Sequence, residues 1–195
     1  MSAKKLCLLA VLTAFLTGGK LALAFIPNVE IVTLLLIVYA LTLRRSEALA
    51  VCAVFIMIEI LIWGFNPWWI VLYFIYWPSL VLTVSLLPKS RPVQTLNMKN
   101  AGLAKVLPRR VIFAIVIGVI FTALFGVLST FIEIIFMGGL GTGRFWTYYY
   151  FRYVAGIAFF VTHVASNAVI LPLLVPVLYR TMNTFLKSSS FSARI

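Results

Sequence analysis

The chain has 195 residues, of which 64% are hydrophobic and only 10% are charged, and its formal net charge is +12. A water-soluble domain of this length cannot bury so much apolar surface, so the composition excludes that class and predicts an integral membrane protein. The basic residues lie between hydrophobic segments, as topology signals do, which disfavours a nucleic-acid-binding protein.

Hydrophobic runs predict an all-α bundle of about six transmembrane helices that forms a single membrane domain over residues 1–195. The expected spans are 6–25, 31–43, 48–65, 68–87, 111–137 and 153–178. A helix that crosses the hydrocarbon core needs about 20 residues, so the second span is short. The first run is interpreted as a span and not as a cleaved signal peptide, because it is too long and has no fitting small-residue cleavage site.

The distribution of lysine and arginine predicts the orientation of the bundle. With the N-terminus inside, the inner segments hold 13 of the 16 basic residues, so both termini are expected to be cytoplasmic. The segment 88–110 is then a cytoplasmic loop, and 138–151 is an outer loop. Four glycines in the sequence GGLGTGR favour a gating loop that closes over a ligand, although an ordinary flexible loop with an aromatic belt explains them equally well.

Ionisable and polar groups inside apolar spans are expensive, and here most of them gather in the outer half of the predicted bundle, with His163 near the midplane and Asn167 one turn below it. Such a one-sided distribution predicts a polar cup that is open to the outside. The simpler alternative is that Lys20 pairs with Glu30 or Glu59 only to hold helices together. The groups concerned are Lys20, Glu30, Glu59, Glu133, Arg144, Arg152, His163 and Asn167.

An aromatic wall is predicted at the outer end of the fourth span, where Trp68, Trp69 and Tyr73 follow a turn. Aromatic rings could hold a flat or bulky organic ligand by stacking and apolar burial. Anchoring at the membrane interface is the alternative explanation for the first two.

Two small residues four positions apart, Ala10 and Ala14, occupy the inner half of the first span. Small residues at this spacing let another helix backbone approach closely. They indicate either a docking surface for a partner or packing inside this bundle.

An enzyme is not expected. The spacing of His163 and Asn167 resembles the last motif of the membrane-embedded prenyl-protein proteases, but the chain has no paired glutamates and only one histidine. It also has no aspartate for a Ser-His-Asp triad and no phosphate-binding loop for ATP hydrolysis. Its two cysteines, Cys7 and Cys52, are too few for a metal site, so no metal or cofactor is expected in this chain.

Several motifs together resemble one family. They are the small-residue pair on the first span, the turn FIPNVEIVT, the NPWW entry to the fourth span and the last span YVAGIAFFVTHVASNAVILPLLVPVLY. This pattern resembles the substrate-binding (S) component of an energy-coupling factor (ECF) vitamin transporter. The resemblance covers nearly the whole chain and is strongest at residues 10–39 and 146–179.

The resemblance implies a subunit of the bacterial plasma membrane that captures a vitamin outside the cell. It then docks through Ala10 and Ala14 on a transmembrane coupling subunit with two ATPase subunits, which would bind ATP and Mg. The loops 27–30, 64–68 and 138–151 would form the lid. Cobalamin is the expected substrate; pantothenate, a queuosine precursor and pyridoxine-like compounds remain alternatives.

Within this interpretation, aromatic side chains would supply contact area and polar ones would orient the substrate. The candidate residues are Asn28, Glu30, Asn66, Trp68, Trp69, Tyr73, Arg144, Trp146, Tyr149, His163 and Asn167. Two other classes compete with it. One is a stand-alone secondary transporter or small channel, which would usually show an inverted repeat; the other is a structural or assembly protein of the membrane.

Overall fold

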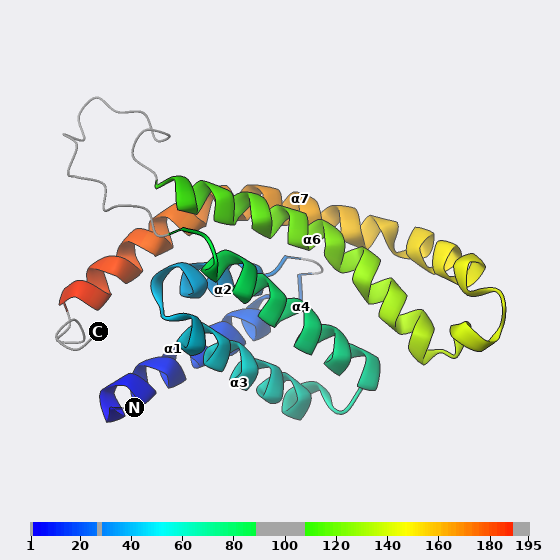
Figure 1. Ribbon diagram of the computed structural model, residues 1–195, viewed down its shortest axis with the longest axis horizontal. Coiled ribbons are helices and arrows are strands. Elements are labelled where there is room, and N and C mark those ends of the chain that lie inside the picture. The colour runs from blue at the N-terminus through cyan, green and yellow to red at the C-terminus, as the bar shows by residue number, and fades with distance from the viewer. Residues whose placement is uncertain (1, 27–28, 89–107, 189–195) are drawn as a thin grey trace.

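The computed structural model describes residues 2–26, 29–88 and 108–188 (Figure 1). The regular structure of these residues is helical, which confirms the predicted all-α class. The elements are α1 (Ala3–Leu23), α2 (Val32–Thr42), α3 (Arg45–Trp63), α4 (Pro67–Ser85), α6 (Arg109–Phe136), the short 3₁₀ helix η1 (Gly139–Gly141) and α7 (Phe145–Ser188). Most of the predicted cytoplasmic loop 88–110 lies outside the described residues, as do Pro27 and Asn28.

Five of the described helices are long and apolar enough to cross a membrane: α1, α3, α4, α6 and α7. Their outer surfaces carry large apolar side chains, among them Phe15, Leu61 and Leu173, each more than 60% exposed. So much exposed apolar surface suits contact with lipid and not with water. The chain therefore has the construction of a multi-pass membrane protein.

Helix α2 differs from the other five. It has 11 residues, so it is about 17 Å long, whereas a hydrocarbon core is about 30 Å thick. Nine of its side chains are buried, and it packs against α1, α3, α4, α6 and α7. The predicted short second span is thus the central helix of the bundle, and its neighbours cover it on every side.

Helices α6 and α7 form the longest packed pair (Figure 1). Small residues recur every four positions along the buried face of α6, where Gly118 and Gly126 flank Thr122. A Cβ atom on Gly118 would lie 2.5 Å from Ile37 Cδ1 and 2.7 Å from Leu171 Cδ1. The absence of a side chain at Gly118 thus leaves room for the ends of the Ile37 and Leu171 side chains, which a larger residue would displace.

Helix α7 is longer than the predicted span 153–178, because it runs from Phe145 to Ser188. The predicted outer loop 138–151 is wrong in its second half, and the connection from α6 ends at Arg144. Rings at intervals of four residues explain the difference: Phe145 stacks on Tyr149, and Tyr149 stacks on Tyr153. This ladder continues the helix through a segment whose composition resembles an interfacial loop.

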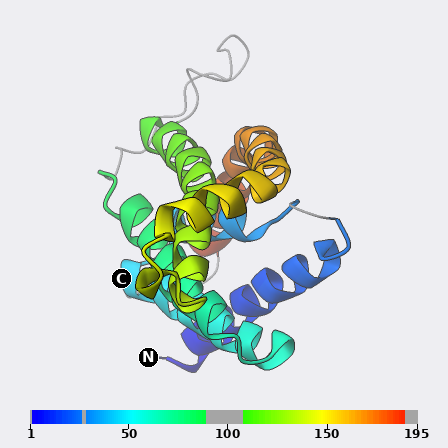
Figure 2. The same cartoon turned by 90° about the vertical axis from the view of Figure 1, so that its right-hand side faces the viewer.

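Successive helices run in alternating directions. The start of α1 and the end of α7 lie at one end of the bundle, on the left of Figure 1, and the α3–α4 and α6–α7 connections lie toward the other. Viewed from that second end, α1 and the α6–α7 pair occupy different sides of the bundle (Figure 2). The arrangement agrees with two termini on one side of a membrane; which side that is stays a prediction.

Candidate functional site

A cavity of about 470 Å³ lies among α1, the α1–α2 connection, α3 and α4, and one residue each from α2, α6 and α7 reaches it. Most of its wall is apolar or aromatic, and a few ionisable groups converge on it. The lining residues are Lys20, Leu23, Ala24, Ile26, Val29, Glu30, Val32, Ile56, Glu59, Ile60, Trp63, Gly64, Asn66, Trp69, Ile70, Tyr73, Trp77, Phe125 and His163.

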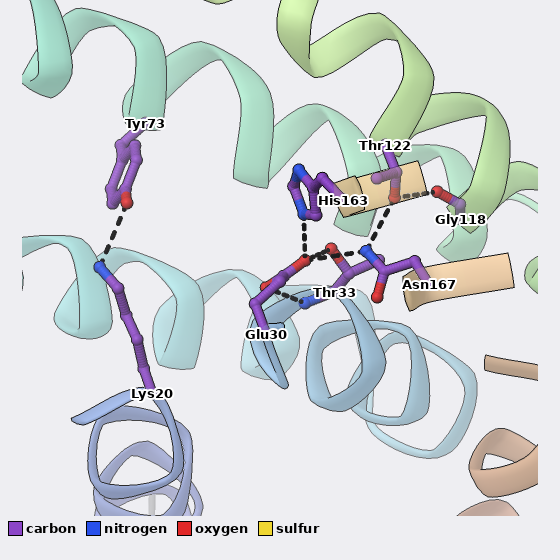
Figure 3. A network of polar contacts seen from close by, with 8 residues as sticks. All are labelled: Lys20, Glu30, Thr33, Tyr73, Gly118, Thr122, His163 and Asn167. Atoms are coloured by element: carbon purple, nitrogen blue, oxygen red, sulfur yellow. Dashed lines mark hydrogen bonds and ion pairs between the residues drawn. The ribbon is translucent and has the colours of Figure 1, made fainter. Parts of the chain in front are cut away.

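Glu30 is the centre of a hydrogen-bonded cluster on one side of the cavity, called here the Glu30 cluster (Figure 3). Its Oε2 accepts the Thr33 backbone N–H at 3.1 Å, and its Oε1 accepts the Thr33 hydroxyl. The same Oε1 lies 3.2 Å from His163 Nε2 and 3.1 Å from Asn167 Nδ2. Because a carboxylate oxygen can only accept, His163 donates from Nε2.

The Glu30 cluster extends behind the cavity to α6. The Asn167 amide also donates to Thr122 Oγ1 at 3.0 Å, and that hydroxyl donates to the Gly118 carbonyl oxygen at 2.8 Å. The side chains of His163 and Asn167 belong to the same buried stripe of α7, one turn apart. The cluster therefore ties the α1–α2 connection to α2, α6 and α7.

A second cluster, the Lys20 cluster, consists of Lys20, Glu59 and Tyr73 from α1, α3 and α4. The ammonium of Lys20 forms an ion pair with Glu59 Oε2. It also donates to the Tyr73 hydroxyl at 3.2 Å (Figure 3). It also lies 5.1–5.9 Å from the ring centroids of Phe55, Trp69 and Tyr73. Such distances are those of cation–π contacts.

Aromatic rings connect the two clusters. Along α4, Trp69 packs on Tyr73 with centroids 5.1 Å apart, and Tyr73 meets Trp77 edge to face at 5.8 Å. On the other side, the Phe125 ring meets the His163 imidazole edge to face at 5.5 Å. The cavity thus offers ring faces along its length and polar groups at two separate places.

The structure brings five of the sequence-predicted residues to the cavity wall, namely Glu30, Asn66, Trp69, Tyr73 and His163. Asn167 lies behind the wall, fully buried and bonded to Glu30. Trp68 lies beside the wall, edge to face with Trp69. Asn28 lies outside the described residues.

Three predicted residues, Arg144, Trp146 and Tyr149, are not part of the cavity wall. The reason is the early start of α7, since the α6–α7 hairpin extends beyond the α3–α4 connection and takes these residues with it (Figure 1). Trp146 is 72% exposed there, and the Tyr149 hydroxyl donates to the Val127 carbonyl oxygen at 3.3 Å.

The predicted polar cup is therefore divided. Glu133 does not line the cavity but accepts two hydrogen bonds from Arg152, at 2.9 and 2.7 Å, which join α6 to α7. Lys20 and Glu59, recognised as intramembrane charges but not proposed as site residues, do line it. An apolar stripe of α3 also lines the cavity; it consists of Ile56, Ile60 and Trp63. Their spacing of three to four residues around Glu59 places them on one face of the helix, and this pattern in the sequence could have predicted that they line the cavity.

The small-residue pair on α1 has no role in packing this bundle. Ala10 and Ala14 are exposed, while the buried face of α1 carries Leu9, Leu12 and Leu16. Packing inside the bundle, one of the two explanations of the pair, is therefore wrong. The face remains available to another helix or to lipid.

Chemically, the arrangement is suited to binding. Apolar walls supply contact area, and two polar clusters supply orientation. Among the residues that the structure describes, no three His, Cys, Asp or Glu side chains gather as metal ligands would. A comparison of the chain with protein-family models, with curated proteins and with solved structures finds no match.

Proposed function

We propose that this chain is the solute-binding component of an ATP-driven importer of the ECF type, in the plasma membrane of a bacterium. It would capture a vitamin or vitamin-like molecule from outside the cell. The observation that carries the proposal is the cavity of about 470 Å³, because its volume and its mixture of rings with a few converging polar groups are those of a small-molecule site.

The position of the cavity also supports the proposal. It is lined by the α1–α2 connection and by Gly64 and Asn66 at the α3–α4 turn, both of which the distribution of basic residues assigns to the outer side. A solute could enter there without crossing the bundle. Release on the inner side would then require a rearrangement, which is the step that a partner would drive.

The partners would be a transmembrane coupling subunit and two ATPase subunits, which would bind ATP and Mg. The exposed face of α1 around Ala10 and Ala14 is the proposed docking surface, since a small-residue face allows close approach of another helix in lipid. This chain would hydrolyse nothing itself.

The first experiment is calorimetry on the purified chain in nanodiscs against a vitamin panel that contains cobalamin, pantothenate, pyridoxine, a queuosine precursor and thiamine. We expect one compound to bind without ATP or partners, and Trp69→Ala to weaken it at least tenfold by removing a ring from the wall. If the folded protein binds no compound on the panel, the proposal is wrong and an assembly role gains ground.

Partner dependence is tested by uptake. Ala14→Leu should leave binding unchanged and abolish ATP-dependent uptake in cells, because the larger side chain crowds the docking face. Ala158→Leu, the same change at an exposed position of α7, is the matched control. Uptake by proteoliposomes that contain this chain alone would instead establish the stand-alone transporter.

A further inference from the structure

We propose that the cavity selects a compact, flat aromatic molecule that carries one positive charge. This inference rests on the proposed function and narrows its substrate class. The proposed ligand is a small heterocyclic cation instead of a large corrinoid. The charges, the unpaired polar atoms, the aromatic wall and the size of the cavity support this choice.

The first argument is the balance of charge. Two carboxylates, those of Glu30 and Glu59, line the cavity, but only one lysine does. Lys20 is paired with Glu59. Glu30 is held by a hydroxyl, a backbone N–H, an amide and an imidazole, so with a neutral imidazole the cavity carries one negative charge in excess. A buried charge without a counter-charge is costly, and a cationic ligand would remove that cost.

The second argument is an unpaired acceptor. Glu59 is only 4% exposed, and its Oε1 has no hydrogen-bond partner among the described residues. A buried carboxylate oxygen is normally satisfied, so a donor on a ligand would supply the missing partner, provided that the Glu59 side chain rotates to bring this enclosed atom to the cavity surface. Trp77 Nε1, on the same cavity wall, is a buried donor that also lacks a partner among those residues, which suits a ligand with one acceptor as well.

The third argument is the nature of the wall. The rings of Trp69 and Tyr73 lie within cation–π distance of the Lys20 ammonium, so the aromatic side chains of this wall already stabilise one positive charge, and ring faces of the same kind would favour a cationic ligand beside it. A flat ligand ring placed between the aromatic side chains of α4 and the Phe125 ring would stack on both.

Size sets the upper limit on the ligand. Pockets for drug-sized molecules measure about 300–1,000 Å³, and this cavity of about 470 Å³ is in the lower half of that range. A corrinoid is much larger than a drug-sized molecule, so it would require the helices to move apart. A heterocycle of one or two rings with short substituents fits the cavity as it is.

The test uses three bicyclic probes of similar size and different charge: 1-methylquinolinium (cation), 2-methylquinoline (neutral) and quinoline-2-carboxylate (anion). Each is titrated into the full chain in nanodiscs near pH 8, with empty nanodiscs subtracted, and binding is read from calorimetry and tryptophan fluorescence. We expect the cation to bind at least about tenfold more tightly than the neutral probe, and the anion not to bind.

Glu59→Gln identifies the source of the preference. It lets the Lys20 ammonium balance Glu30, so the cavity no longer carries a net negative charge, and it removes the free carboxylate oxygen. We therefore expect the cation to lose about tenfold in affinity while the neutral probe is unchanged. Glu133→Gln is the matched control, because Glu133 is also a buried, paired glutamate of a helix but lies outside the cavity wall. It should leave all three affinities as they were.

Three results would overturn the inference: a neutral probe or anion that binds as tightly as the cation, a cation preference that survives Glu59→Gln, or no binding of any probe. In each case, tight binding of an uncharged or anionic vitamin from the panel would leave the proposed function intact. Its absence would remove both proposals.

Discussion

The two glutamates of the cavity are held in different ways. Glu30 accepts hydrogen bonds from a backbone N–H and three side chains, supplied by α2 and α7, and both of its oxygens are used. Glu59 has one partner, Lys20, and one of its oxygens has none among the described residues. Yet the side chain of Glu59 is 5% exposed and that of Glu30 is 17% exposed.

Judged by burial alone, Glu59 would be the structural residue and Glu30 the one that contacts a ligand; the hydrogen bonds indicate the opposite. A buried carboxylate with every lone pair occupied is part of the fold, because several elements depend on it. A buried carboxylate with an unused oxygen beside a cavity can still accept a donor from a ligand. Glu30 therefore fixes the shape of the cavity, whereas Glu59 keeps one unused acceptor beside it.

The largest expected effect is that of Glu30→Ala. It leaves the donors of Thr33, His163 and Asn167 without their acceptor, so we expect the free energy of unfolding to fall by about 3 kcal/mol. Unfolding in mixed micelles, followed by tryptophan fluorescence, measures the loss.

Glu30→Gln is the matched variant, because its amide oxygen still accepts hydrogen bonds. It should recover about half of the lost stability. If Glu30→Ala had the same unfolding midpoint in denaturant as the wild type, Glu30 would not stabilise the fold, and the contrast with Glu59 would be wrong.

The Lys20 cluster should behave differently. Lys20→Met leaves the Glu59 carboxylate buried without its cation, and we expect a loss of about 2 kcal/mol, less than for a fully enclosed pair because the lysine side chain is 20% exposed. The double variant Lys20→Met/Glu59→Gln should recover most of that loss, since neither partner is then charged.

The same unfolding assay completes this double-mutant cycle. A double variant as unstable as Lys20→Met would show that the hydrogen bonds of Lys20, and not the pairing of charges, stabilise this region. The Lys20 cluster would then be stabilised mainly by hydrogen bonds, as the Glu30 cluster is.

The all-α class and the approximate position of each helix could be predicted from the sequence, because runs of about 20 apolar residues leave few other structures in lipid. The gathering of ionisable groups was predictable in part, since each one is costly in a span. Glu30 and His163 line the cavity as that pattern predicts, whereas Glu133 and Arg144 do not.

The pairings were not predictable. Lys20 meets Glu59 across 39 positions in sequence, and the choice of Glu59 instead of Glu30 depends on how α1, α2 and α3 are rotated about their axes. The start of α7 was missed for a similar reason, because aromatic residues suit both an interfacial loop and a helix that stacks its own rings. The stacking of Phe145 on Tyr149 and of Tyr149 on Tyr153 favours the helix here.

The smallest expected effects come from removing one hydroxyl from each cluster. Thr122→Val deletes a group that accepts from Asn167 and donates to the Gly118 carbonyl oxygen in a fully enclosed place, so stability should fall by about 1 kcal/mol. Tyr73→Phe deletes the acceptor at 3.2 Å from Lys20 Nζ, but the ammonium keeps its ion pair with Glu59 and stays partly exposed, so the loss should be about half as large. Both variants are compared in the same unfolding assay. The reverse order would mean that the Lys20 cluster is the enclosed one, and Glu59 would then be a structural residue that no ligand reaches.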